Sequence, residues 1–211
     1  MTMRAGEVYE HPFERLVVRV GTAESEGREL VIDLYVKANA PGVPPHIHPR
    51  MEEWLTVIEG KAEVLSADGE WKTLSPGEGI VVPPNTVHSW RPVGGNVRIL
   101  GGARPGDRFE EMWRQFMGLA QDGKLGPNGD HLPFLQAMAL VHEFPDVTAL
   151  AGPPIVLQHA LAAVLAPIGR LRGYRGKYEE YLRRGPSEIV ELEPLPVQFS
   201  TSLTEARGRP T

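Results

Sequence analysis

Two histidines and two glutamates lie close together in residues 44–60, PPHIHPRMEEWLTVIEG. His46 and His48 are two residues apart, so on an extended strand both imidazoles point to the same face. Imidazole nitrogen and carboxylate oxygen are the usual protein ligands of Zn, Fe, Mn and Ni ions. This spacing alone is weak support for a metal site, because surface histidines can be spaced in the same way. A second stretch, GEGIVVPPNTVHSWRP, contributes His88 and strengthens the metal interpretation.

The adjacent Glu52 and Glu53 cannot both face such a site, because neighbouring side chains of a strand point to opposite faces. In the strand that follows, Glu53 shares a face with Leu55, and Trp54 lies on the other face. The turn at residues 49–50 resets the register relative to the two histidines. Alternation alone therefore leaves the choice between the two glutamates open.

The first half of the chain is rich in short apolar runs separated by turns. Asp68-Gly69 and Ser75-Pro76-Gly77 are typical of hairpin and loop connections. Strands are predicted at residues 15–20, 29–36, 54–59, 61–66, 70–74, 80–82, 88–92 and 97–101. Many short strands at regular spacing favour a β-sandwich or a small barrel.

After Asp107, which could cap a helix, the apolar residues recur at helical spacing. Helices are predicted from Phe109 to Ala120 and at residues 132–144, 153–171 and 174–184, and the end of the chain is rich in Pro, Glu, Ser and Thr. We therefore expect a β-barrel over residues 1–106, a helical extension over 107–185 and an extended polar tail over 186–211. The fold class is mainly β with a C-terminal α part.

The two histidine-containing stretches together resemble the paired motifs of the cupin superfamily. The first reads His46-x-His48-x4-Glu53-x6-Gly60 and the second Gly77-x5-Pro83-x-Asn85-x2-His88-x3-Pro92. Asn85 stands where the family often has Gly, which is a mild change because both tolerate positive φ. Pro92 replaces a frequent Asn, and Ala40 stands at the leading Gly of the first motif, with Gly42 nearby. The resemblance covers about residues 29–104.

This resemblance implies a double-stranded β-helix, or jelly-roll, barrel that holds a divalent transition metal, with Fe, Mn, Ni and Zn all compatible. The implied ligands are His46, His48, Glu53 and His88, and the distance from Glu53 to Gly60 favours it over Glu52. Three imidazoles and one carboxylate leave coordination positions open for substrate, unlike a closed structural zinc site. Cupins commonly pair through their sheets, so the resemblance also implies a homodimer.

We therefore expect a metal-dependent enzyme that acts on a small organic molecule chelating the metal through oxygens. Dioxygenase-like oxidation is the first hypothesis, and a non-catalytic barrel that binds or senses a small molecule is the alternative. Trp90, two residues after His88, is expected to line the pocket together with Trp54 and Arg50. Packing roles for the tryptophans and a surface role for the arginine are the alternatives.

Composition limits the other classes of function. With 22 Lys and Arg against 27 Asp and Glu, a net charge of -5 disfavours nucleic-acid binding. The apolar run at residues 155–168 is interrupted by Gln158, His159 and Pro167, so it predicts a buried helix and no membrane span. The absence of cysteine and of an apolar N-terminal leader fits a cytoplasmic protein.

A basic run formed by Arg170, Arg172, Arg175 and Lys177 follows this apolar segment. Cations near a helix C-terminus interact favourably with the helix dipole, which is a structural explanation for the run. An interfacial membrane or anion-binding patch is the alternative.

Overall fold

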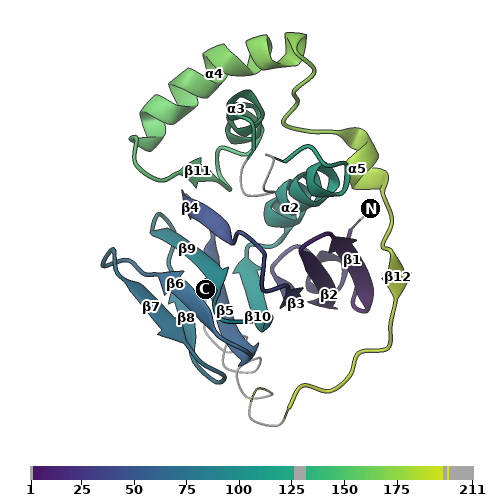
Figure 1. Cartoon of the computed structure of the whole chain (residues 1–211). Coiled ribbons are helices and arrows are strands. Elements are labelled where there is room, and N and C mark those ends of the chain that lie inside the picture. Colours follow the sequence, from purple (N-terminus) through teal and green to yellow (C-terminus); the bar gives the residue numbers. More distant parts are fainter. Residues whose placement is uncertain (1, 126–131, 197–198, 200–211) are drawn as a thin grey trace.

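The computed structural model describes residues 2–125, 132–196 and 199 (Figure 1). Within these residues the strands form a seven-stranded sheet in the order β12-β1-β2-β3-β10-β5-β8 and a five-stranded sheet in the order β11-β4-β9-β6-β7. All of the paired strands are antiparallel. The expected mainly-β fold, a jelly-roll barrel followed by a helical extension, is confirmed.

The strands of the larger sheet are β1 (Glu7–His11), β2 (Glu14–Val20), β3 (Leu30–Val36), β5 (Glu52–Glu59), β8 (Gly79–Val82), β10 (Val97–Arg104) and β12 (Glu188–Ile189). Those of the smaller sheet are β4 (Val43–Ile47), β6 (Ala62–Leu65), β7 (Trp71–Leu74), β9 (Val87–Pro92) and β11 (Ala149–Leu150). Each predicted strand is present to within a few residues. The strands predicted from the sequence did not include β1, β4, β11 or β12.

Alternation along β5 divides its side chains between two apolar clusters. Leu55 and Val57 belong to the large cluster that also contains core residues of both sheets, and Trp54 and Ile58 belong to a smaller one. The smaller cluster includes Leu195 and Phe199, which come from the region predicted as a polar tail. The described part of that tail therefore contributes buried residues and the short strand β12.

The helices are α1 (Thr22–Ser25), α2 (Asp107–Gln121), α3 (Phe134–Glu143), α4 (Ile155–Leu171) and α5 (Glu179–Arg183). Asp107, which was predicted to cap α2, is instead its first residue. The N-cap position is occupied by Gly106. In Figure 1, α2 lies beside β1–β3, whereas α3 and α4 lie above β4 and β11 in this view. None of the helices in the described ranges has both the length and the apolar character needed to cross a membrane.

The predicted helix at residues 174–184 is shorter in the structure, because its first half packs as an irregular segment. Gly173 has φ 86°, a left-handed conformation that ends α4. A Cβ on Gly176 would lie 2.3 Å from the carbonyl oxygen of Ala139, so this segment lies directly against α3. The close packing of this segment against α3 therefore prevents the helix that the local spacing of apolar residues predicted.

Candidate metal centre

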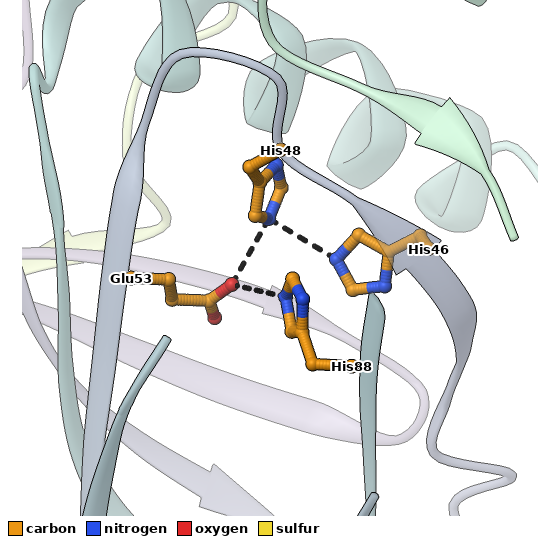
Figure 2. Close-up of side chains that lie close together, drawn as sticks. All are labelled: His46, His48, Glu53 and His88. Carbon is orange, nitrogen blue, oxygen red and sulfur yellow. Dashed lines mark hydrogen bonds and ion pairs between the residues drawn. The ribbon is translucent and has the colours of Figure 1, made fainter. Parts of the chain in front are cut away.

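The structure brings His46, His48, Glu53 and His88 together (Figure 2). One potential ligand atom from each lies within 4.8 Å of all the others. His48 Nε2 is 2.9 Å from Glu53 Oε2 and 3.1 Å from His46 Nε2, and His88 Nε2 is 3.0 Å from the same carboxylate oxygen. The four residues that the two sequence motifs single out therefore form one cluster.

Both sheets contribute to this cluster. His46 of β4 is the direct register partner of His88 of β9 in the smaller sheet, and Glu53 comes from β5 of the larger sheet. His48 lies immediately after β4, and its carbonyl oxygen accepts a 2.7 Å hydrogen bond from the backbone N–H of Asn85. Asn85 has φ 63°, the left-handed conformation expected where the family often has Gly. This bond joins the loops of the two motifs.

The Nδ1 atom of each histidine is paired with a backbone carbonyl. The contacts join His46 to Pro44 at 2.9 Å, His48 to Val147 at 2.6 Å and His88 to Thr86 at 3.0 Å. A ring that donates its Nδ1–H in this way presents the Nε2 lone pair on its other side when it is neutral. In the cluster, the three Nε2 atoms all face inward.

The charges within the cluster shift the proton affinity of its members. Burial, reinforced by the neighbouring His48 and His88, lowers the pKa of His46 to about 3, so its imidazole is neutral. Burial would raise the pKa of Glu53, but hydrogen bonds from His48 and His88 outweigh it and hold that pKa well below its ordinary value. Burial would lower the pKa of His88, but the Glu53 carboxylate outweighs it and raises that pKa.

The donor set fits a divalent metal ion. Without a cation, the Nε2 atoms of His48 and His88 can donate to the Glu53 carboxylate when they carry a proton. When all three rings are neutral and donate from Nδ1, three Nε2 lone pairs and the carboxylate face one another, and a cation would satisfy all four groups. Two ligands at right angles, each about 2.1 Å from an ion, are about 3.0 Å apart. The contacts of 2.9 to 3.1 Å within the cluster match this separation.

The helical extension contributes directly to this centre, which no sequence motif indicated. Val147, which accepts the bond from His48, follows α3, and β11 immediately after it pairs with β4 through Leu150 and His46. The ring of Phe109, from α2, contacts the His48 ring edge-on with centroids 5.9 Å apart. A backbone carbonyl acceptor has no side-chain signature, so only the fold reveals that residues 107–150 orient a ligand.

A single glutamine of α4 holds β11 in place. Gln158 is buried, accepts a 2.8 Å hydrogen bond from the N–H of Leu150, and donates to the carbonyl oxygens of Leu150 and Pro153. Gln158→Leu should release β11 and shift the carbonyl of Val147, which lowers metal affinity about 10- to 100-fold. Metal titration and the visible absorption spectrum of the Co(II)-loaded protein measure this effect.

The matched control is Gln121→Leu, because Gln121 is exposed and, among the described residues, its side chain bonds to Glu10 and Arg184, which are far along the chain from the ligands. This variant should keep both the affinity and the Co(II) spectrum of the wild type. An unchanged affinity and spectrum in Gln158→Leu would refute the positioning role of β11.

Of the other residues predicted for the pocket, Trp90 lies on the same strand face as a ligand, whereas Trp54 does not. Trp90 is buried in the large cluster, on the same face of β9 as His88. Trp54 is buried in the smaller cluster, on the opposite face of β5 from Glu53, so its side chain does not face the four ligands. Arg50 is exposed between β4 and β5, and Glu52 shares the face of Trp54.

Comparisons with known proteins agree with this architecture. The family model described as "Cupin domain" matches residues 34–100. Quercetin 2,3-dioxygenase of Bacillus subtilis (strain 168) is 30% identical over 106 residues, which are 50% of this chain and 31% of that protein. The chain thus matches about a third of the length of this relative.

Solved structures with partial similarity include KdgF from Halomonas sp., at 22% identity and a TM-score of 0.41 over 47% of this chain and 86% of that one. They also include the polyketide cyclase RemF from Streptomyces resistomycificus, at 24% identity and a TM-score of 0.39 over 50% of this chain and 73% of that one. The paired motifs, the two-sheet barrel and the family match together show that residues 34–100 form a domain of the cupin type.

Proposed function

We propose that the barrel is a metal-dependent oxidoreductase of the dioxygenase type. Its substrate would be a small organic molecule that chelates the metal through oxygen atoms. The observation that carries the proposal is the convergence of three imidazole nitrogens and one carboxylate on a common point. A site of this composition leaves coordination positions open and is characteristic of functional metal ions in preference to structural ones.

His46, His48, Glu53 and His88 would hold the metal, for which Fe, Mn, Ni and Zn are all compatible. When bound, a metal in such a site supplies Lewis-acid or redox chemistry. The carbonyls of Pro44, Thr86 and Val147 would fix the orientation of the three rings, because each pairs with an Nδ1 atom. Glu53 is a ligand in this proposal and not a free general base.

The surroundings suit an organic substrate with a largely apolar body. Met51, Leu55, Trp90 and Phe109 belong to the apolar cluster that fills the barrel beside the four ligands. Apolar walls of this kind limit access of water to the reacting atoms. Arg50, exposed on the loop between two ligand-bearing segments, has no side-chain partner among the described residues and would attract an anionic substrate.

The similarity to quercetin 2,3-dioxygenase supports the oxidative assignment, although it extends over only 31% of that protein. Quercetin is therefore the first substrate to test, followed by catechols and diketones, which also present adjacent or paired oxygens. The cytoplasmic location and the homodimer remain predictions.

Oxygen uptake tests this proposal directly. Protein loaded anaerobically with Fe(II), Mn(II) or Ni(II) and then exposed to oxygen should consume it in step with loss of one of these substrates, whereas protein loaded with the redox-inert Zn(II) should not. The matched control is His88→Ala loaded in parallel, which lacks one ligand and should consume no oxygen above background.

Two outcomes separate the alternatives. Stoichiometric metal without oxygen consumption for any substrate, but with a substrate-induced thermal shift, would favour the non-catalytic binding barrel. Protein that carries no transition metal and gains no stability when one is added would contradict both the oxidative proposal and the metal site.

A further inference from the structure

Helix α4 exposes an apolar surface along its whole length. We call this the α4 face, and it consists of Val156, Leu157, Leu161, Val164, Ile168 and Leu171. Val156 is 82% exposed, Val164 63% and Leu171 89%. The opposite side of the helix packs against α3 through Ala162, in a cluster with Met138 and Val141. Residues 155–169 contain no charged side chain, so the outward side is as apolar as the inward one.

A helix that is apolar on all sides is normally buried on all sides. A continuous exposed face about 25 Å long, given a rise of 1.5 Å per residue, therefore indicates a partner that is absent from the isolated chain. Figure 1 shows α4 at the outer edge of the molecule, with only α3 and β11 between it and the barrel. Nothing in the described part of the chain covers this outer side.

An exposed aromatic side chain lies near the C-terminal end of the α4 face. Phe134, at the start of α3, is 58% exposed. Its neighbour Leu135 lies against Gly169 near the end of α4, since a Cβ on Gly169 would be 3.8 Å from the Leu135 Cβ. Phe134 thus lies at the same end of α4 as Ile168 and Leu171.

The same end carries three exposed arginines, namely Arg170, Arg172 and Arg175. In the described part of the chain none of the three guanidinium groups has a carboxylate partner. Arg19 and Arg98 of the barrel differ, because both bind the buried Asp33. Three arginines without a carboxylate partner among the described residues therefore lie beside the α4 face, in a chain whose net charge is -5.

We propose that this surface docks on an anionic lipid bilayer, with the α4 face in the boundary between headgroups and acyl chains and the three arginines on headgroup phosphates. An apolar helix face beside clustered arginines complements both chemistries of such a membrane. The α4 face of a second copy complements only the apolar part, because residues 155–169 contain no acidic side chain that could pair with the three arginines. The inference does not depend on the metal or on the reaction in the barrel.

Co-sedimentation with vesicles tests the proposal on the full chain. The protein should sediment with vesicles of phosphatidylcholine and phosphatidylglycerol, and much less with vesicles of phosphatidylcholine alone. Added salt should weaken the binding, because exposed charges are screened. Each arginine near an anionic surface contributes a factor of about 5, so Arg170→Gln, Arg172→Gln and Arg175→Gln together should lower the partition coefficient about 100-fold.

The apolar contribution is tested separately with Leu157→Ser and Val164→Ser, which should also lower vesicle binding by at least about 100-fold. Both side chains are exposed, so the thermal midpoint in solution should stay close to that of the wild type. The matched controls lie elsewhere on the surface: Ile189→Ser replaces an apolar residue that is 74% exposed, and Arg28→Gln replaces an exposed arginine. Both controls should bind vesicles as the wild type does.

Three results would overturn the proposal. The first is the absence of binding to either kind of vesicle. The second is equal binding to neutral and anionic vesicles that the three arginine substitutions leave unchanged. The third is a dimer in light scattering that Leu157→Ser and Val164→Ser dissociate, together with no vesicle binding, which would make the α4 face an interface between two copies.

Discussion

His48→Ala is expected to abolish stoichiometric metal binding. The wild type should gain about 2.7 kcal/mol when the free metal concentration is a hundred times its dissociation constant. For a domain of this size that corresponds to a rise of about 5 to 10 °C in the thermal midpoint. The variant should show no rise, because it loses the nitrogen that contacts both Glu53 and His46. Elemental analysis and thermal denaturation with and without metal measure the effect.

The adjacent glutamates provide a matched pair of controls. Glu53→Gln should lose most of the metal-dependent stabilisation, because a neutral amide replaces the carboxylate that His48 and His88 both contact. Glu52→Gln should keep it, since Glu52 lies on the opposite face of β5. Equal metal content in wild type and His48→Ala, or a larger loss in Glu52→Gln than in Glu53→Gln, would refute the assigned ligands.

Glu110→Ala should cause a large loss of stability although it removes no metal ligand. Glu110 is buried in α2, where it accepts hydrogen bonds from the backbone N–H of Met3 at 2.9 and 3.0 Å, from the hydroxyl of Thr22, and from Arg114 at 2.9 Å. Without the carboxylate, the buried guanidinium of Arg114 loses its ion-pair partner, and the other two donors lose the side-chain acceptor that the described residues provide. The free energy of unfolding should fall by about 3 to 5 kcal/mol in urea denaturation.

Glu111→Ala is the control for this prediction. Glu111 is the next residue of α2, and its contacts with Arg108 at 2.8 Å and Lys177 at 3.6 Å lie at the surface. Its removal should cost less than about 1 kcal/mol. Adding Arg114→Met to Glu110→Ala should recover part of the loss, because no unpaired charge then stays buried. A cost of Glu110→Ala no larger than that of Glu111→Ala would contradict the proposed role.

The metal ligands could be identified from the sequence, whereas the role of Glu110 could not. The metal ligands form a motif, because a metal requires particular side chains and the strand repeat places His46 and His48 on one face. Glu110 belongs to no motif, and its partners Met3 and Thr22 lie 107 and 88 residues away along the chain. A lone glutamate in an amphipathic helix is indistinguishable in sequence from an exposed one.

For Trp54, the sequence indicates which face of the strand the side chain lies on. It does not indicate which distant residues pack against that face. Alternation along the strand already separated Trp54 from Glu53, and its assignment to the pocket depended only on nearness in sequence. The structure packs it against Leu195 and Phe199. These partners come from a segment that composition alone predicts to be extended and polar.

The sequence by itself determined the types and spacing of the four ligands, most strands of the barrel and the main helices. These features depend on side-chain chemistry and on short periodic patterns, both of which are local. Only the tertiary structure decided that Val147 orients His48, that Gln158 holds β11 beside His46, and that α4 keeps an apolar face outward. Backbone acceptors are the same at every residue, and exposure depends on which distant segments pack together, so neither can be read from the local sequence.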